Sequence, residues 1–128
     1  MSIKIKPFYD INPIPIYRTL DEPGVLGVAN DRGTIRLSKD LTNPAQMQEV
    51  IDHEMVHIDQ FDVNSKDTGN FAYDNESMYF SPKNSAKTII TKRRPAADGN
   101  PGLAQEKEAN NENIQKKIKK KYNGKQWP

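Results

Sequence analysis

One stretch of the chain carries apolar residues at helical spacing. Within residues 41–61 they recur at intervals of one, three or seven positions, which places them on one side of a helix. They are Met47, Val50, Ile51, Ile58 and Phe61. Asn43 followed by Pro44 is typical of an N-cap and a first helical position. The pattern therefore predicts a helix that begins at Pro44 and ends near Phe61.

Shorter patterns on either side predict strands. Residues 25–29 and 34–38 flank the turn-forming sequence Asn-Asp-Arg-Gly, which favours a hairpin. Residues 71–80 carry aromatic side chains around a polar centre, which predicts a second hairpin. Residues 89–91 are expected to form a short strand. Residues 1–24 contain several prolines among isolated apolar positions, and we expect an extended N-terminal arm or strand there.

A second helix is expected near the C-terminus. Asn100 and Pro101 form its predicted start, a sparse apolar stripe continues to about Tyr122, and Asn123 with Gly124 is the predicted end. These elements predict an α+β fold with a small antiparallel or mixed sheet. The expected organisation is an arm over residues 1–24, one domain over 25–122 and a polar tail over 123–128.

The amino-acid composition limits which metal ligands and which binding partners the chain can have. The chain has 128 residues, which favours one domain, and it has no cysteine, so any metal site must use nitrogen and oxygen ligands. No secretory signal or membrane-spanning stretch is visible, so we expect a soluble protein made in a cytoplasm, without a membrane partner. The net charge of +2 is too weak to indicate nucleic acid. The basic residues 92–94, 116–117 and 119–121 lack interleaved aromatic side chains, which disfavours nucleic acid further.

The sequence Asp-His-Glu-Met-Val-His-Ile-Asp at residues 52–59 carries the candidate chemistry. His53 and His57 are the only histidines of the chain, and they lie four apart within the predicted helix. That spacing places both on one helix face, where they can hold one ion between them. Glu54 is adjacent and can accept a proton from an attacking water without ligating the ion. The pattern predicts a zinc site rather than a chance pairing on a helix surface.

A catalytic zinc ion takes three protein ligands, so the third must be a carboxylate. The candidates are Asp62, Asp74, Glu76, Glu106 and Glu108. Asp62 lies too close to the histidines along the chain to fold back. Glu76 is expected at a solvated hairpin tip, and Glu108 is expected to point away. Glu106 shares a helix face with Leu103 and Asn110, which should look inward, so Glu106 is the predicted third ligand.

His-Glu-Met-Val-His followed by Glu-Lys-Glu-Ala-Asn at residues 106–110 resembles the gluzincin-type zinc metallopeptidases. The Ala-Asn ending is similar to that of peptidases from mobile elements that cleave phage repressors. The chain also resembles small phage-encoded zincin-like proteins, in which a Tyr-Asp-rich hairpin, here residues 73–80, separates the two helices. The resemblance implies a minimal zincin-like domain with one zinc ion per chain.

The resemblance also implies roles for individual residues: His53, His57 and Glu106 as ligands, Glu54 as general base, and Asn110 as the residue that orients a ligand histidine. A peptide or protein would be the substrate, pairing with the edge of the strand at residues 34–38. The candidates for transition-state stabiliser are Tyr73, Tyr79, Arg93 and Arg94. The main alternative is a structural protein of a phage virion, with virion proteins as partners and zinc as a staple between the helices.

Overall fold

The computed structural model describes residues 14–93 and 100–126. Strands and helices are mixed along the chain, so the fold is α+β as predicted. The elements are β1 (Ile16–Leu20), β2 (Gly27–Ala29), β3 (Ile35–Ser38), α2 (Pro44–Phe61), β4 (Asn70–Tyr73), β5 (Ser77–Ser81), β6 (Ile89–Lys92), α3 (Ala104–Ala109) and α4 (Glu112–Gln126). Residues 1–13 of the predicted N-terminal arm lie outside the described residues.

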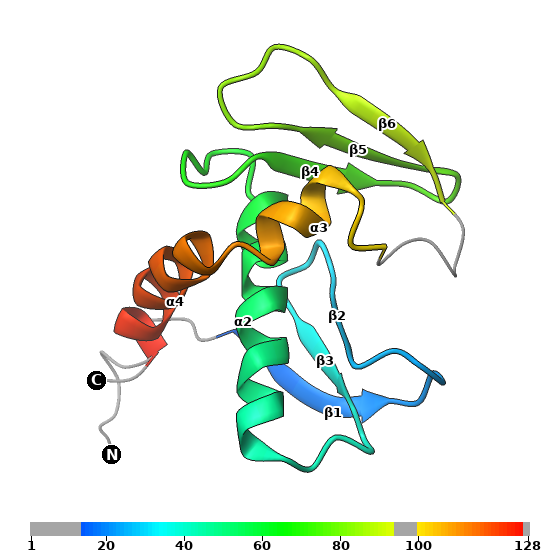
Figure 1. The fold of residues 1–128 in the computed structure, drawn as a ribbon, viewed down its shortest axis with the longest axis vertical. Helices are drawn as coiled ribbons and strands as arrows, with labels where there is room; N and C mark the ends of the chain where they lie inside the picture. Colours follow the sequence, from blue (N-terminus) through cyan, green and yellow to red (C-terminus); the bar gives the residue numbers. More distant parts are fainter. Residues whose placement is uncertain (1–13, 94–99, 127–128) are drawn as a thin grey trace.

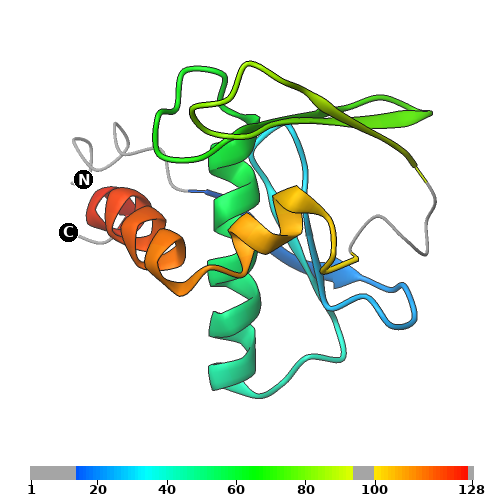
Figure 2. The ribbon, with the colours of Figure 1, turned by 45° about the horizontal axis from the view of Figure 1, so that its top comes forward.

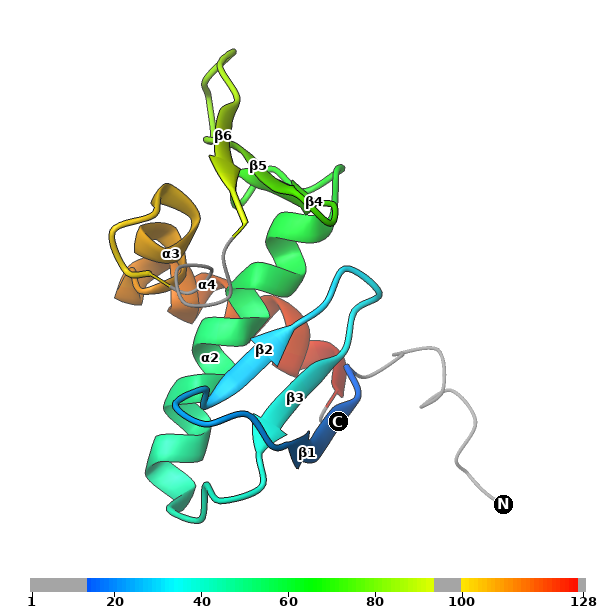
Figure 3. The ribbon, with the colours of Figure 1, turned by 90° about the vertical axis from the view of Figure 1, so that its right-hand side faces the viewer.

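Helix α2 is the centre of the molecule, and every other layer is arranged around it (Figure 1). The sheet of β1, β3 and β2 covers one side of α2, as Figure 3 shows. Helices α3 and α4 cover further sides of α2, and in Figure 2 α3 lies in front of α2 while α4 lies to its left. The second sheet, β4–β5–β6, lies across the C-terminal end of α2. A helix surrounded in this way must bury much more than one apolar stripe.

The start of α2 confirms the prediction. The Asn43 side-chain oxygen accepts hydrogen bonds from the backbone N–H groups of Ala45 (2.9 Å) and Gln46 (3.1 Å), and Pro44 occupies the first turn. Farther along, all seven residues from 54 to 60 are buried. Four of those seven are polar or charged, namely Glu54, His57, Asp59 and Gln60. Such groups are costly to bury unless each finds a hydrogen-bond partner.

The first sheet has β3 at its centre, with the order β1–β3–β2. β2 and β3 form the predicted antiparallel hairpin, and the Asn30 side chain closes its turn by accepting from the Arg32 and Thr34 N–H groups. Gly33 at the end of that turn has φ of 87°, which favours glycine. The prediction that residues 34–38 offer a free edge is wrong, because β1 pairs with β3 in parallel on its other side.

The second sheet confirms the hairpin at residues 71–80 and the strand at 89–91. β5 pairs antiparallel with both β4 and β6. Phe71, Met78 and Phe80 form a small buried cluster between this sheet and the end of α2. Gly69, just before β4, has no room for a side chain, since an added Cβ would lie 2.5 Å from the Phe80 ring. This contact holds the loop before β4 close to the sheet.

The C-terminal segment differs from the single helix that the sequence predicts. It is broken at Asn110 and Asn111, so that α3 begins at Ala104 instead of Pro101, and α4 begins at Glu112. The Asn111 side chain accepts from the Asn113 and Ile114 N–H groups and so caps a new helix. At its far end α4 continues to Gln126 rather than ending at Asn123 and Gly124.

A buried carboxylate fastens α4 to α2. Asp59 is fully buried and accepts hydrogen bonds from Ser65 Oγ, from Thr68 Oγ1 (2.9 Å), from Lys121 Nζ (2.8 Å) and from Tyr122 Oη (2.8 Å). Burial raises the pKa of Asp59, but these four hydrogen bonds outweigh it and lower the pKa below its usual range. The ionised carboxylate therefore contributes to stability.

We predict that Asp59→Asn lowers the free energy of unfolding by about 3 kcal/mol, because removing one partner of a buried ion pair leaves the other charge uncompensated. The lowered pKa of Asp59 means that its contribution is complete above the unfolded-state pKa of about 3.9 and is lost as pH falls through the folded-state value. Urea unfolding at pH 7 and pH 3 measures both effects. The difference in free energy of unfolding between wild type and Asp59→Asn should be smaller at pH 3 than at pH 7.

The exposed Asp40→Asn serves as a control that removes the same charge from the surface and should cost less than about 0.5 kcal/mol. Equal effects of the two substitutions at pH 7 would show that the Asp59 network does not stabilise the fold.

Candidate metal centre

Three predicted ligands converge between α2 and α3. His53 and His57 lie one turn apart on α2, with ring centroids 4.9 Å apart. Glu106 reaches across from α3 and lies between them. Its Oε1 is 3.0 Å from His53 Nε2, and its Oε2 is 2.9 Å from His57 Nε2. One carboxylate therefore faces both imidazoles, each through the same ring nitrogen.

This cluster could hold a metal ion. One ligand atom from each of His53, His57 and Glu106 lies within 4.8 Å of the others. Bonds of about 2.0–2.1 Å to a tetrahedral ion would place neighbouring ligand atoms about 3.3 Å apart, close to the 3.0 and 2.9 Å between Glu106 and the two histidines. Two imidazole nitrogens and a carboxylate are also a donor set that suits divalent ions of the first transition row. The residues thus fit a metal in both spacing and chemistry.

The outer ring nitrogens of both histidines already face acceptors. His53 Nδ1 lies 2.9 Å from the side-chain oxygen of Asn110, and His57 Nδ1 lies 2.7 Å from that of Gln60. An acceptor at Nδ1 requires the proton to be there, so Nε2, which faces Glu106, is the nitrogen that can give up its proton and bind a metal ion through its lone pair. Asn110 thus lies where the resemblance implies that a histidine-orienting residue should be.

The general-base candidate lies beside the cluster. Glu54 is buried with 7% of its surface exposed, and its Oε2 is 4.0 Å from His53 Nε2. Burial raises the pKa of Glu54, an effect only partly offset by the neighbouring His57 and His53. A backbone hydrogen bond from Ala29 on β2 also reaches this carboxylate. A carboxylate with a raised pKa is better suited to accept and return a proton near neutral pH.

Electrostatics couple Glu106 to the histidines. Burial raises the pKa of Glu106, but hydrogen bonds from His53 and His57 outweigh it and lower the pKa to about 2. Burial lowers the pKa of His57, yet the hydrogen bond and charge of Glu106 raise it on balance. Glu106 is therefore ionised at all ordinary pH values, and its negative charge attracts either a proton on His57 or a cation.

The other predicted carboxylates lie elsewhere. Asp62 ends α2 as its C-cap. Asp74 closes the β4–β5 turn, where it accepts from the backbone N–H groups of Glu76 and Ser77, and Glu76 itself is exposed at the tip. Glu108 points away from the cluster as predicted. Its Oε1 accepts from Gln60 Nε2 and from the Gly69 N–H, both at 3.0 Å.

The proposed transition-state stabilisers form a separate group. Tyr79 Oη donates to Asp74 at 2.8 Å, and the Arg93 guanidinium lies 4.9 Å from the centre of the Tyr73 ring. Tyr73 packs among the aromatic residues that reach His57 through Phe71, whose ring centroid is 6.0 Å from that of His57. Arg94 lies outside the described residues.

Sequence analysis missed Gln60. This residue is fully buried, and its contact with His57 ties it to the metal cluster. A signal was present, because Gln60 follows His57 by three positions and so lies next to it on the helix surface. The apolar pattern that predicts the helix includes Ile58 and Phe61 and leaves out the polar Gln60 between them.

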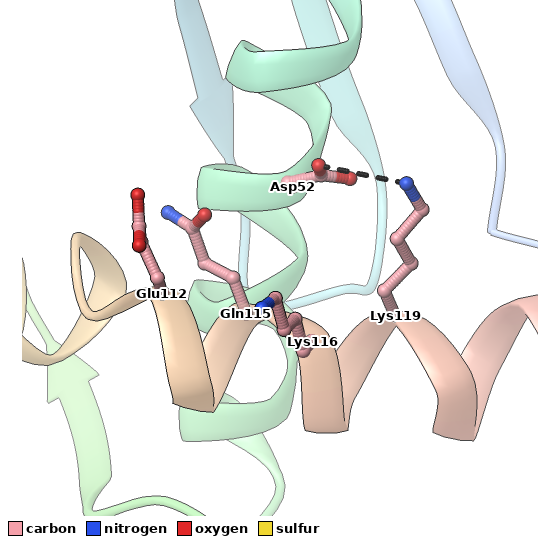
Figure 4. A pocket seen from close by; sticks show the side chains of 5 residues that line it. All are labelled: Asp52, Glu112, Gln115, Lys116 and Lys119. Carbon is pink, nitrogen blue, oxygen red and sulfur yellow. Dashed lines mark ion pairs between the residues drawn. The ribbon is translucent and has the colours of Figure 1, made fainter.

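A polar pocket lies between α2 and α4, next to the cluster but without any of its three residues. Figure 4 shows its lining of Asp52, Glu112, Gln115, Lys116 and Lys119. An ion pair of 3.8 Å between Asp52 and Lys119 spans it. This contact adds to the attachment of α4.

Three comparisons with known proteins give no match for this chain. It matches no protein-family model, and comparison with curated proteins and with solved structures finds no similar protein. Among the described helices, none is both long enough and apolar enough to cross a membrane.

We predict that Glu106→Gln weakens zinc binding by at least about 10-fold, because it removes the only charged ligand of the three. Competition against a chromophoric chelator measures the affinity, and elemental analysis of wild type should give one zinc ion per chain. Glu112→Gln, an exposed change in the first turn of α4, is the matched control and should leave the affinity unchanged. A Glu106→Gln protein that binds zinc as tightly as wild type would exclude Glu106 as a ligand.

Proposed function

We propose that this protein is a zinc-dependent metallopeptidase of the minimal gluzincin type. The observation that carries the proposal is the combination of three ligands with a neighbouring carboxylate that is not one of them. Structural zinc sites have four protein ligands, whereas catalytic sites have three and leave one position open. The 21% exposure of the His53 side chain supports access from solvent on that side.

The residues have distinct roles in this proposal. His53, His57 and Glu106 hold the ion, and Asn110 keeps the His53 ring oriented through its Nδ1–H. When bound, zinc polarises the scissile carbonyl and makes water more acidic. Glu54 accepts the proton of the attacking water and then transfers it to the leaving amine. Its burial next to the histidines supports this role, because the raised pKa brings the carboxylate closer to neutral pH.

The edge of β2 is the place where an extended peptide would dock. Ser38 N–H donates to Leu26 O and Asn30 N–H donates to Thr34 O, so alternate residues of this ladder face β3. Gly27 and Ala29 consequently turn their backbone groups toward the outer edge, and the hydrogen bond from Ala29 to Glu54 agrees with this. A substrate strand added there would lie beside Glu54. This assignment replaces the β3 edge expected from the sequence.

We predict that Glu54→Gln retains zinc and loses peptide hydrolysis by about 10²–10⁴-fold, because the amide keeps the size of the side chain but cannot accept a proton. A quenched peptide library assayed by fluorescence and mass spectrometry measures the activity. Glu49→Gln, an exposed change on the same helix, is the control and should retain it. Zinc-loaded wild type that cleaves no member of the library while its metal content is complete would contradict the peptidase proposal.

A second candidate function has its own support. The cluster joins α2 to α3 across more than fifty residues, and α4 carries few apolar side chains, so a bound ion would act as a staple. This arrangement would suit a structural protein, for example one assembled into a phage virion, in which the metal serves folding alone.

We predict that a chelator lowers the melting temperature of wild type by several degrees and that of Glu106→Gln by less, because the variant is stabilised less by the ion that it binds more weakly. Differential scanning calorimetry with and without the chelator provides the test. A large decrease in the melting temperature on chelation, together with complete absence of peptide hydrolysis, would favour the structural function. A wild-type protein whose melting temperature does not respond to chelation would rule out the staple.

A further inference from the structure

Gln60 is the most constrained polar side chain near the cluster. It is fully buried, and both N–H donors and the oxygen of its amide have hydrogen-bond partners. Its Oε1 faces His57 Nδ1 at 2.7 Å, while its Nε2 donates to the carbonyl of Gln105 (3.1 Å) and to Glu108 Oε1 (3.0 Å). An amide has two N–H donors, so both are satisfied.

These partners fix which way the amide points. If the Gln60 amide were turned by 180°, its oxygen would face two acceptors, the Gln105 carbonyl and the Glu108 carboxylate. Acceptors placed against each other without a proton lose both hydrogen bonds, and at a buried site no water replaces them. Only one orientation therefore satisfies the site, and it presents oxygen to His57.

Glu108 is itself held in place. The backbone N–H of Gly69 donates to both of its carboxylate oxygens, at 3.0 and 3.2 Å. Gly69 cannot move away easily, because it packs directly against the Phe80 ring. The Asn70 side chain, at the start of β4, donates a hydrogen bond to the backbone carbonyl of Gln60 at 3.0 Å, so neighbouring residues of this segment bind Glu108 and Gln60.

We infer that Gln60, oriented by Glu108, is a positioning residue that fixes the His57 ring with its proton on Nδ1 and its Nε2 lone pair toward the metal position. The inference goes beyond the assigned ligands and Asn110, and it rests on the metal binding proposed above but not on peptide hydrolysis. The two histidines then differ in how far their Nδ1 partners are shielded from solvent. Asn110, the partner of His53, is exposed, whereas Gln60, Glu108 and Gly69, which act on His57, are buried or half-buried.

The test uses zinc affinity and a spectroscopic signature in the full-length protein. Gln60→Met keeps the approximate volume and removes the acceptor, and we expect zinc affinity to fall about 10- to 100-fold. In the cobalt-substituted protein, each ligand histidine bound through Nε2 gives a strongly shifted, exchangeable Nδ1 proton signal. The signal of His57 should exchange slowly with solvent in wild type and should broaden or vanish in Gln60→Met.

Two further variants separate positioning from general stability. Thr68→Val removes a buried hydrogen bond of the Asp59 network without touching His57, and it should leave both zinc affinity and the Nδ1 signal unchanged. The double variant Gln60→Glu with Glu108→Gln exchanges donor and acceptor between the two side chains. His57 still meets an acceptor, while the Gln105 carbonyl loses its donor, so part of the affinity should return.

The outcomes distinguish this inference from the proposed function. Wild type that binds metal tightly, together with a Gln60→Met protein of equal affinity and unchanged Nδ1 exchange, would overturn the positioning role alone. Wild type that binds neither zinc nor cobalt would overturn both. A loss of affinity in Thr68→Val as large as in Gln60→Met would reduce Gln60 to a general contribution to stability.

Discussion

The fold depends on satisfying the polar side chains that α2 buries. Residues 54–60 are all buried, and Glu54, His57, Asp59 and Gln60 among them cannot remain without partners. Almost all of those partners come from elsewhere in the sequence, on β2, on the loop before β4, on α3 and on α4. The remaining elements are thus held around α2 by specific hydrogen bonds as well as by apolar contact.

This constraint explains why the C-terminal segment is broken. Successive residues of a helix are about 100° apart, so His57 and Asp59 point about 200° apart around α2. Their partners, Glu106 on α3 and Lys121 on α4, belong to one continuous segment. A straight helix cannot contact two opposite sides of another helix, so the segment must change direction between them. The break at Asn110 and Asn111 provides the change, and the two asparagines use their side chains to bind His53 and to cap α4.

Much of the architecture could be predicted because local signals decided it. The cap at Asn43, the turn before Gly33 and the hairpin around Asp74 depend on neighbours in the chain, and these elements formed where the sequence placed them. The meeting of Glu106 with the histidines was also within reach, because helical spacing fixes which residues share a face.

What the sequence could not reveal depends on contacts between distant segments. The parallel pairing of β1 with β3 has no local signature, and it removed the free edge expected for residues 34–38. The helix break was hidden because residues 100–122 contain good helix formers on both sides of it, while Asn110 has a partner 57 positions earlier. The burial of Gln60 and Asp59 was not predicted, because polar residues within an apolar helix pattern are expected at the surface.

The balance of charge around the cluster connects the fold to its chemistry. Glu54 and Glu106 bring two buried carboxylates to one place, and burial opposes the ionisation of both. Positive charge is needed there, and either protonated imidazole or one divalent cation can supply it. Binding of a cation must therefore release protons, which makes metal affinity rise with pH wherever His57 would otherwise remain protonated. The raised pKa of His57 and a metal ion are thus alternative responses to the same buried negative charge.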